Sequence, residues 1–575
     1  GTGKNNLCFM ADVGSNTDGF MTEHMEFADQ LAGYVESEHP EFLVNKLYYD
    51  AYKKDMTAGT YPDVRSGLQK LLKDGLLLFN YTGHGGTTAL SDEKVLTQTD
   101  INQFTYTHLP VWVTATCDFT RFDDLNTSAG EDVFLNKSSG GIALFTTVRV
   151  AYSRPNFPIN DNVIRNLFER NNGRRRTLGE VMQATKNTLS SVYKLGFCLI
   201  GDPAVKMAYP EFGMKVTTVN GQSVDGNSIS FKALEKITVE GEVLDVSGQL
   251  ATDFTGIVNP TVKDSKTTVT CLKNSNKDDS PAFTFTDYPN TIFMGNDSVR
   301  NGKFSFTFTV PKDISYSNLQ GKMNLYAVDT ENGNEAQGNF DNFIVGGTSD
   351  TAETDTIGPE IRALYLNDTT FVDGGQVNTT PYFVAELWDK SGVNITGSSV
   401  GHDMMLVIDE STVLSYNLNS YYELLPGEDG TGIVKFPIPA LEPGKHTAEF
   451  WVWDILNNST VRTFTFEVVE GLKPFLFDVI ATPGIAREQV TFHLMHNRPE
   501  SRMRVGIMVY DLAGRQLWKH EESGTSGLFE NYTVSWDLTS GGARMRPGVY
   551  IYRAAISTDN SKDATKARKF IILGE

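Results

Sequence analysis

Short, almost continuously apolar segments alternate with helical patterns through the first 209 residues, and this alternation constrains the fold more than any other feature. The apolar segments lie at 7–11, 42–49, 76–81, 109–116 and 141–148. Apolar side chains at helical spacing mark four further segments, at 21–36, 61–74, 160–170 and 178–193. A strand that is apolar on both faces is typical of a parallel sheet covered by helices on both sides. We therefore predict an α/β domain with a mostly parallel sheet.

The pattern changes after Tyr209 to short alternating segments rich in Val, Thr, Phe and Tyr, separated by Gly, Asn and Asp. Residues 304–310 and 464–468 are examples. A period of two predicts antiparallel strands with one buried face. The polar, small residues at 346–355 are typical of a linker. We expect an α/β domain followed by three all-β, immunoglobulin-like sandwich domains, with boundaries at 1–209, 210–349, 350–471 and 472–575.

Two matches between the second and third of these segments indicate a repeated domain. GEVLDVSG at 241–248 resembles AELWDKSG at 385–392. Further along, YAVD at 326–329 resembles WVWD at 451–454, and each is followed three residues later by Asn. The matches keep their order, which favours a true repeat. The alternative is a chance likeness, because any hairpin shows an apolar strand followed by Asp, Gly and Asn.

The charge excludes some partners. The chain has 50 Lys and Arg against 71 Asp and Glu residues, which makes its formal charge −21. Nucleic acids and anionic membrane surfaces bind basic patches, so neither is expected as the main partner. No apolar run reaches the roughly 18 residues of a membrane-spanning helix. The chain starts with Gly1 and shows no signal peptide, so we expect a processed or truncated piece of a longer protein.

Two motifs that can carry chemistry follow neighbouring apolar segments. NYTGHGG at 80–86 contains His84, and TATCD at 114–118 contains Cys117. If the two strands are parallel neighbours, both residues leave the sheet at its carboxyl edge, where open α/β folds place their sites. Histidine is the usual base that activates a cysteine thiol. We therefore predict Cys117 as nucleophile, His84 as its base, and the backbone N–H groups of Gly85 and Cys117 as an oxyanion hole.

Each residue taken singly has a simpler interpretation. A lone cysteine at a strand end is usually a buried apolar residue, and a histidine among glycines can simply cap a turn. The pair on consecutive strand ends favours catalysis over both. The other three cysteines, Cys8, Cys198 and Cys271, are expected to be core residues, because four cysteines without a Cys-x-x-Cys pair indicate neither a disulfide framework nor a zinc site.

These motifs resemble the His-Gly and Cys dyad of clan CD cysteine peptidases, which include caspases, legumain and gingipains. The longer resemblance is to the gingipain family and its sortase branch. It rests on TCDFTRFDD at 116–124, SAGE at 128–131, GGIAL at 140–144 and GDP at 201–203. The last segment is similar to the sorting domain of type IX secretion cargo, with YDLAGR at 510–515, WD at 536–537, RPGVY at 546–550 and KFIIL at 569–573.

The resemblance implies a gingipain-like fold and a surface enzyme that acts as a sortase. Such an enzyme removes the sorting domain of a cargo protein, holds the cargo as a thioester on Cys117, and transfers it to an amine of anionic lipopolysaccharide. Its implied partners are an outer-membrane shuttle β-barrel, the sorting domains of cargo, anionic lipopolysaccharide and other subunits of an attachment complex. Its implied location is the extracellular face of the outer membrane. A hydrolytic endopeptidase and a non-enzymatic surface adhesin are the alternatives.

Gingipains also use an acidic residue to orient the histidine, and Asp12, Glu23 and Glu26 are open candidates for that role. Gingipains bind calcium as well. The acidic groups that could serve here are Asp118, Asp123, Asp124, Glu131 and Asp132. Solvated surface carboxylates or helix caps are the favoured interpretation of these residues. No other cofactor is expected.

Overall fold

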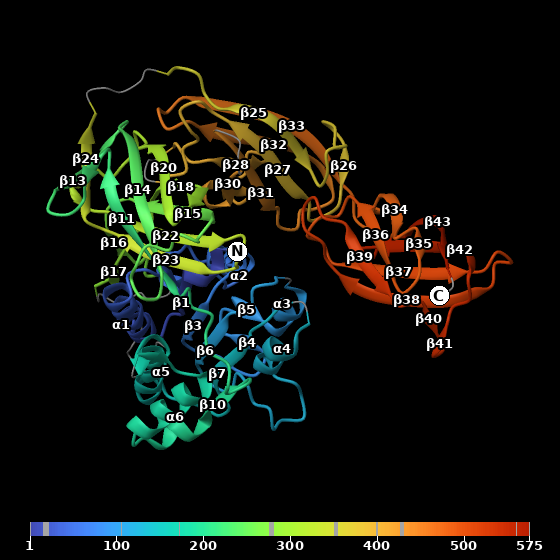
Figure 1. The fold of residues 1–575 in the computed structure, drawn as a ribbon, viewed down its shortest axis with the longest axis horizontal. Coiled ribbons are helices and arrows are strands. Elements are labelled where there is room, and N and C mark those ends of the chain that lie inside the picture. The colour runs from blue at the N-terminus through green and yellow to red at the C-terminus, as the bar shows by residue number, and fades with distance from the viewer. Residues whose placement is uncertain are drawn as a thin grey trace. The chain divides into compact units, whose positions relative to one another are not determined.

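The computed structural model describes residues 2–14, 22–104, 106–137, 139–171, 173–274, 281–349, 355–397, 401–425, 430–558 and 560–573. The chain forms two compact units, Gly1–Ala352 and Glu353–Glu575, each taken separately below (Figure 1). In the described part of the chain, no helix has both the length and the apolar character needed to cross a membrane.

A six-stranded sheet forms the centre of the first 209 residues, with the strand order β10-β7-β6-β3-β1-β2. Five strands run parallel, and β10 runs antiparallel to β7 at one edge. All residues of β3, β6 and β7 are buried, as the continuous apolar segments predict. The strands are β1 Asn6–Ala11, β2 Leu43–Tyr48, β3 Leu78–Thr82, β6 Val111–Ala115, β7 Ala143–Thr147 and β10 Phe197–Ile200. The predicted mostly parallel sheet is confirmed.

Helices cover both faces of this sheet (Figure 1). Side chains of α1, α5 and α6 pack on one face with Leu7 and Phe9 of β1. Side chains of α2, α3 and α4 pack on the other face with Cys8 and Met10. The helices are α1 Glu23–Glu38, α2 Pro62–Asp74, α3 Gln98–Gln103, α4 Ala129–Leu135, α5 Ser153–Phe168 and α6 Leu178–Thr188. Short strand pairs complete the domain: β4 Ala89–Leu90 with β5 Leu96–Thr97, and β8 Arg170–Asn171 with β9 Arg174–Arg175.

Two predicted helix boundaries are wrong. The helix expected from residue 160 begins at Ser153, because Pro155 lies in the first turn, where no backbone donor is needed. The helix expected to reach residue 193 ends at Thr188. There the Ser191 side chain accepts from the backbone N–H of Tyr193 and starts a separate 3₁₀ turn, Val192–Gly196.

The rest of the first unit is all β. It contains a nine-stranded sheet, a three-stranded sheet of β13, β24 and β21, and the β16–β17 hairpin. The strands are β11 Phe212–Val219, β12 Gln222–Ser223, β13 Ile229–Ala233, β14 Lys236–Leu244, β15 Gly256–Lys263, β16 Thr267–Thr270, β17 Thr284–Asp287, β18 Thr291–Met294, β19 Asp297–Arg300, β20 Lys303–Thr309, β21 Leu319–Gln320, β22 Lys322–Asp329, β23 Glu335–Phe340 and β24 Phe343–Thr348.

The β16–β17 hairpin joins the α/β domain to this β region. Cys271 and Phe285 belong to the same hydrophobic cluster as α1 and α5, and the Phe285 ring lies 4.7 Å from that of Tyr48. The buried carboxylate of Asp50 accepts hydrogen bonds from the backbone N–H groups of Lys273 and Asn274, each at 2.9 Å. The α/β domain and the following β region therefore share a core within one compact unit.

The second unit is also all β, with two pairs of sheets. Its first half contains β25 Glu360–Leu366, β26 Gln376–Val377, β27 Tyr382–Trp388, β28 Met405–Ile408, β29 Ser415–Asn417, β30 Tyr422–Leu424, β31 Thr431–Pro437, β32 Gly444–Trp453 and β33 Ser459–Val468. Its second half contains β34 Leu476–Thr482, β35 Ile485–Ala486, β36 Val490–His496, β37 Met503–Tyr510, β38 Gln516–Gly524, β39 Tyr532–Trp536, β40 Thr539–Ser540, β41 Ala543–Arg544, β42 Gly548–Ser557 and β43 Ala564–Ile572.

The three β regions share one pairing pattern. Each has an antiparallel triplet, namely β11-β14-β20, β25-β27-β31 or β34-β36-β39. Each also has a short parallel pair with its last strand, namely β13 with β24, β26 with β33, or β35 with β43. The first region has a second parallel pair, β11 with β23. The segments matched in the sequence, 241–248 and 385–392, begin in the middle strands β14 and β27. The matched segments thus occupy corresponding places in the pairing pattern.

Candidate active site

The two predicted catalytic residues leave neighbouring strands at the same edge of the sheet. Strands β3 and β6 are parallel, and Thr82 at the end of β3 pairs with Ala115 at the end of β6. His84 and Cys117 each follow two residues later. The structure therefore confirms the predicted parallel neighbours, and it places both residues at the carboxyl edge.

The His84 loop is built around the carboxylate of Asp12, which is fully buried at the end of β1. The backbone N–H of His84 donates to Oδ2 of Asp12 at 2.8 Å. The Tyr81 hydroxyl lies 2.7 Å from the carbonyl oxygen of His84 and 3.1 Å from Oδ2 of Asp12. A Cβ at Gly83 would lie 2.3 Å from Oδ1 of Asp12, so only glycine allows this close approach. The backbone of His84 is thus anchored to a buried acid.

A second histidine, His24 of α1, lies between this acid and the ring of His84. Nδ1 of His24 is 2.6 Å from Oδ1 of Asp12, and the two histidine rings meet edge to face with centroids 4.9 Å apart. One ring nitrogen of each histidine and one Asp12 oxygen lie within 4.8 Å of one another. Burial lowers the pKa of His24, but the charge and hydrogen bond of Asp12 outweigh it and raise the pKa above its ordinary value. No sequence pattern pointed to His24.

Of the three acidic candidates, Asp12 is the one that contacts His84. Glu23 accepts hydrogen bonds from Ser153 and Arg154 of α5, each at 2.6 Å. The Glu26 carboxylate bonds the hydroxyl of Thr22. The Asp12 carboxylate accepts from the backbone N–H of His84 and also bonds His24, whose ring contacts the His84 ring. Among the described residues, Asp12 makes no hydrogen bond to the His84 ring itself.

Cys117 is held in its resting position by a loop backbone. Its thiol donates to the carbonyl oxygen of Ala151, with Sγ to O at 3.0 Å, and the N–H of Ala151 lies 3.4 Å from Sγ. Burial raises the pKa of the Cys117 thiol, and the neighbouring Asp118 carboxylate raises it further. Within the described residues, Sγ makes no hydrogen bond to His84. In this structure the Cys117 thiol is therefore engaged by the Ala151 backbone rather than by the His84 ring.

The two backbone donors predicted to form an oxyanion hole have no other role in the described part of the chain. Neither the Gly85 N–H nor the Cys117 N–H donates a hydrogen bond to another described residue. A Cβ on Gly85 would lie 2.4 Å from Oγ1 of Thr116, the residue before the nucleophile. That buried Oγ1 atom has no hydrogen-bond partner. The loop of Gly85 and the turn of Cys117 are therefore in close contact.

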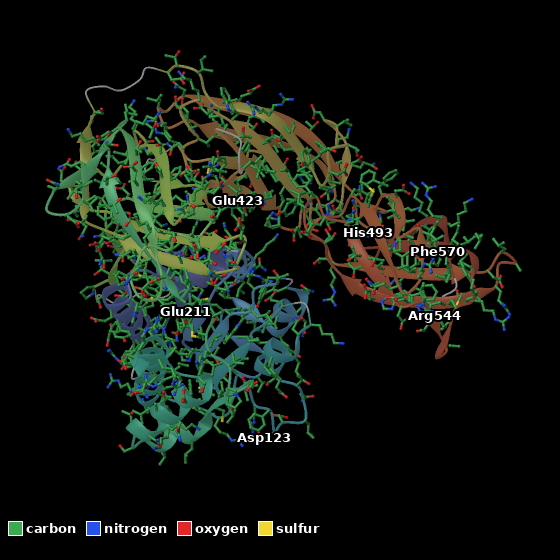
Figure 2. All side chains as sticks on the ribbon, in the orientation of Figure 1. Asp123, Glu211, Glu423, His493, Arg544 and Phe570 are labelled. Atoms are coloured by element: carbon green, nitrogen blue, oxygen red, sulfur yellow. The ribbon has the colours of Figure 1, made fainter. Side chains whose placement is uncertain are left out.

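Large apolar side chains are exposed beside the nucleophile. Val150 and Tyr152, which flank Ala151, are 61% and 64% exposed, and the Tyr152 ring lies 6.0 Å from that of Tyr193. Charged groups nearby are paired, since Arg154 bonds Glu23 and Arg149 bonds exposed Asp123, which Figure 2 labels. The loop that holds Cys117 thus presents two exposed apolar side chains between paired charged groups.

Four of the five acidic residues considered for calcium have protein partners among the described residues. Asp123 pairs with Arg149, and Asp124 lies 3.7 Å from Arg121. Glu131 accepts from the backbone N–H of Ser128 in a capping box at the start of α4. The remaining two are Asp132, which accepts from Gln98 and Asn102, and Asp118, whose Oδ1 is buried without a partner. The favoured interpretation as surface carboxylates and helix caps is confirmed for Asp123 and Glu131.

A carboxylate cluster in the second unit has no counterpart in the sequence reasoning. Asp355, Asp389 and Asp454 bring one oxygen each to within 4.8 Å of one another. Backbone N–H groups of Ser391 and Gly392 donate to Asp389. Burial raises the pKa of Asp389 to about 6, and the other two carboxylates add to the rise. Carboxylate oxygens are ligands suited to calcium, but here each also caps a turn.

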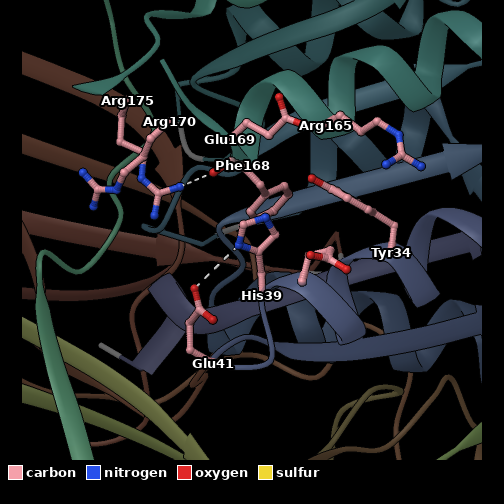
Figure 3. A pocket seen from close by; sticks show the side chains of 9 residues that line it. Tyr34, His39, Glu41, Arg165, Phe168, Glu169, Arg170 and Arg175 are labelled. Carbon is pink, nitrogen blue, oxygen red and sulfur yellow. Dashed lines mark hydrogen bonds and ion pairs between the residues drawn. The ribbon is translucent and has the colours of Figure 1, made fainter. Parts of the chain in front are cut away.

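A surface cavity of about 730 Å³ lies at the opposite edge of the sheet from Cys117, between the ends of α1 and α5. Figure 3 shows the His39 ring beside Phe168, with Glu41 next to it. Burial lowers the pKa of His39. The lining residues are Tyr34, Glu38, His39, Glu41, Arg165, Phe168, Glu169, Arg170 and Arg175. Positive and negative groups are balanced there, and the predicted catalytic residues are not among them.

The other cysteines differ from Cys117. Cys8 is fully buried in β1 and Cys271 is 3% exposed, and burial raises the pKa of both thiols. Cys198 of β10 is half-buried. All four are free thiols.

Comparison with known proteins relates the first domain to one peptidase family. Residues 1–208 match the model of peptidase family C25, which supports a cysteine peptidase and agrees with the resemblance of the sequence motifs to gingipains. Among solved structures, the chain is similar to dimeric latent PorU from Porphyromonas gingivalis, at 26% identity and a TM-score of 0.32. That alignment covers 99% of this chain and 64% of the PorU chain.

The chain is also similar to the Arg-specific cysteine proteinase gingipain R, at 19% identity and a TM-score of 0.30. This alignment covers 59% of this chain and 66% of that one. No curated protein matches the chain.

Proposed function

We propose that this chain is a PorU-like cysteine peptidase that transfers, rather than only hydrolyses, the proteins it cuts. One observation carries the proposal: a cysteine and a histidine end adjacent parallel strands of a domain that matches the C25 peptidase model. The N–H groups of Gly85 and Cys117, which donate to no other described residue, support the same chemistry.

The proposed reaction begins from the neutral thiol. Sγ of Cys117 attacks the carbonyl carbon of the scissile peptide bond, and His84 takes the thiol proton. The N–H groups of Gly85 and Cys117 stabilise the negative charge on the carbonyl oxygen. The C–N bond then breaks, His84 returns the proton to the leaving amine, and the acyl group stays on Cys117 as a thioester. An incoming amine gives an amide, whereas water gives a carboxylate.

The choice between transfer and hydrolysis is tested by mass spectrometry. A protein ending in a sorting domain is incubated with the enzyme and with a small primary amine. Transfer predicts a shortened product carrying the amine as an amide, at a yield that rises with amine concentration. A product ending only in a free carboxylate at every amine concentration would favour the hydrolytic endopeptidase. Cys117→Ala should give neither product, and an uncut protein with the wild-type enzyme would favour a non-enzymatic adhesin.

The proposal extends to the surroundings of the enzyme. We place it on the extracellular face of the outer membrane, with cargo sorting domains as substrates and an amine of anionic lipopolysaccharide as acceptor. The region 472–575, whose YDLAGR and RPGVY motifs lie around β37 and β42, would hold it on a shuttle β-barrel together with other attachment-complex subunits. The apolar side chains beside Cys117, such as Tyr152, would contact the cargo polypeptide.

A further inference from the structure

We propose that His24 is a positioning residue for His84, so that the base of this peptidase is oriented by a histidine held on Asp12 rather than by a carboxylate directly. The inference rests on the proposed function and deepens it. His24 is 6% exposed, and its ring is the aromatic group that meets the His84 ring, 4.9 Å away at an angle of 77°. A base in such a dyad needs a third group to hold its ring.

The anchoring of His24 is specific. Its Nδ1 lies 2.6 Å from Oδ1 of Asp12, which fixes one edge of the ring and the direction in which the rest of it points. The other oxygen of Asp12 accepts from the His84 backbone N–H at 2.8 Å. One buried carboxylate thus fixes the main chain of His84 through one oxygen and the ring beside it through the other.

No other described group performs this task. The hydrogen bonds of His84 involve its backbone: the N–H bonds Asp12, and the carbonyl oxygen accepts from Tyr81 and from the Ser91 N–H at 2.9 Å. In the described residues, no carboxylate makes a hydrogen bond to its ring. The edge of the His24 ring is thus the one aromatic contact on the His84 imidazole among the described residues, and it restricts the last torsion of His84.

The arrangement also suits the charge that forms during reaction. When His84 takes the thiol proton it becomes an imidazolium, and a buried carboxylate within 4.8 Å stabilises that charge. The charged or titratable groups that face His24 are Asp12, Glu23 and His84. Glu23 is neutralised by Arg154, at 2.6 Å, so Asp12 supplies the net negative charge.

Alkylation of Cys117 by iodoacetamide tests the inference without knowledge of the substrate. Its rate is measured from pH 5.5 to 9.5 by peptide mapping of the full chain. His24→Asn keeps a donor for Asp12 but removes the ring. We expect it to slow alkylation about tenfold at pH 7 and to shift the profile to higher pH, since a positioned base contributes at least that much. His24→Phe keeps a ring against His84 and should recover part of the rate.

The double variant separates positioning from a general structural effect. Because His24 acts through His84, adding His24→Asn to His84→Ala should cause no further loss. His39→Asn, a half-buried histidine at the other end of α1, is the matched control and should leave the profile unchanged. Melting temperatures of all variants show whether they fold. If His24→Asn does not fold, Asp12→Asn, which also weakens the His24 anchor, gives a second test.

The outcomes distinguish this inference from the proposed function. A wild-type rate and profile for His24→Asn, with slow alkylation of His84→Ala, overturns the role of His24 and leaves the peptidase proposal standing. An additional loss in the double variant also overturns it. A wild-type rate for His84→Ala overturns the dyad itself, and the positioning role with it.

Discussion

At the residue scale, the site depends on places where a side chain is missing. Gly83 and Gly85 lie so closely against Asp12 and Thr116 that a Cβ at either would lie 2.3 or 2.4 Å from an oxygen. The His84 loop is thereby held against the residues that follow β1 and β6. Sequence reasoning located the glycines next to His84 and assigned only the Gly85 N–H a role, as an oxyanion donor. The structure adds that they bring the loop against a buried acid and the nucleophile's turn.

The matched pair Gly85→Ala and Gly86→Ala tests this packing. The Cβ added by Gly85→Ala would meet Oγ1 of Thr116 and displace either the oxyanion donor or the nucleophile, whereas a Cβ at Gly86 meets nothing within 4 Å. We expect Gly85→Ala to lower kcat/KM about 100-fold, which is the scale of an ångström-sized misplacement. Gly86→Ala should stay within about twofold of wild type. Equal activities of the two variants would contradict the close contact.

The resting state of Cys117 gives a pH prediction. Burial and Asp118 raise the pKa of the Cys117 thiol above its ordinary value, which favours the thiol over the thiolate at neutral pH. We expect the alkylation rate of Cys117 in wild type to rise continuously from pH 6 to 9. A plateau below pH 7 would instead show a preformed thiolate. Peptide mapping should also show Cys117 reacting ahead of buried Cys8 and Cys271.

Cys117 and His84 were predictable because each follows an apolar strand directly, and parallel strands bring their ends to one edge. His24 and Ala151 were not. They reach the site from a helix and a loop that are distant in sequence, and neither lies in a motif with a recognisable spacing. The choice among Asp12, Glu23 and Glu26 also required the structure. Asp12 follows the end of β1, whereas Glu23 and Glu26 lie in the first turn of α1, and the sequence does not show which of these positions reaches His84.

At the element scale, aspartates that follow two strands of the second unit form hydrogen bonds with the turns behind those strands. Asp389 follows β27 and Asp454 follows β32, and each caps the turn behind its strand. The matches in the sequence showed the same feature, an apolar segment followed by Asp, at Asp389 and Asp454. For Asp389 the reason is that β27 occupies the same place in the strand pairing as β14 of the preceding β region. The edge strand β10 was not predicted, because its four residues lie in a segment without an alternating or helical pattern.

The raised pKa of Asp389 predicts a pH-dependent stability. Its pKa of about 6 in the folded unit exceeds its unfolded value, so its contribution is complete below about pH 4 and is lost as the pH rises through 6. Asp389→Asn keeps the acceptor for Ser391 and Gly392 but removes the charge. We expect it to raise the melting temperature of the second unit at pH 7.5 and to change it less at pH 5.

Asp373→Asn is the control with the opposite sign. Hydrogen bonds from Thr465 lower the pKa of Asp373, so its charge stabilises the folded state at pH 7.5. This variant should lower the melting temperature at pH 7.5 or leave it unchanged. A drop on Asp389→Asn at pH 7.5 would contradict the account of the cluster.

At the scale of the whole molecule, the first unit extends past the α/β domain. The β16–β17 hairpin completes the core at Phe285, and Lys46, buried in β2, donates to the carbonyl oxygen of Thr286 at 2.9 Å. A division at residue 209, which the change of sequence pattern suggests, cuts through these contacts. The spacing of apolar residues predicts whether a segment is a helix or a strand. It does not predict which hairpin, distant in the sequence, packs against the core of a domain.

Two shortened chains test this dependence. A chain ending at residue 352 should fold and show wild-type alkylation of Cys117. A chain ending at 209 should lose cooperative unfolding, because it exposes the surface beneath Cys271 and Phe285 and leaves Lys46 without one of its partners. Circular dichroism on heating compares the two. A cooperative, alkylation-competent chain of 209 residues would show that the shared core is dispensable.

Removal of residues 472–575 addresses the proposed attachment. The truncated chain should retain the alkylation rate of Cys117 but no longer co-purify with the outer-membrane barrel. If it still co-purifies, the attachment lies in another region of the chain.

The most direct test of the central claim is to trap the acyl group on the enzyme. A sorting-domain protein is mixed with wild-type enzyme, the reaction is quenched in acid, and the peptides of the enzyme are mapped by mass. We expect the cargo mass on the peptide that contains Cys117, its disappearance on addition of an amine, and no adduct in Cys117→Ala. Cleavage that proceeds without an adduct on Cys117, or that persists in Cys117→Ala, would contradict a thioester mechanism at this residue.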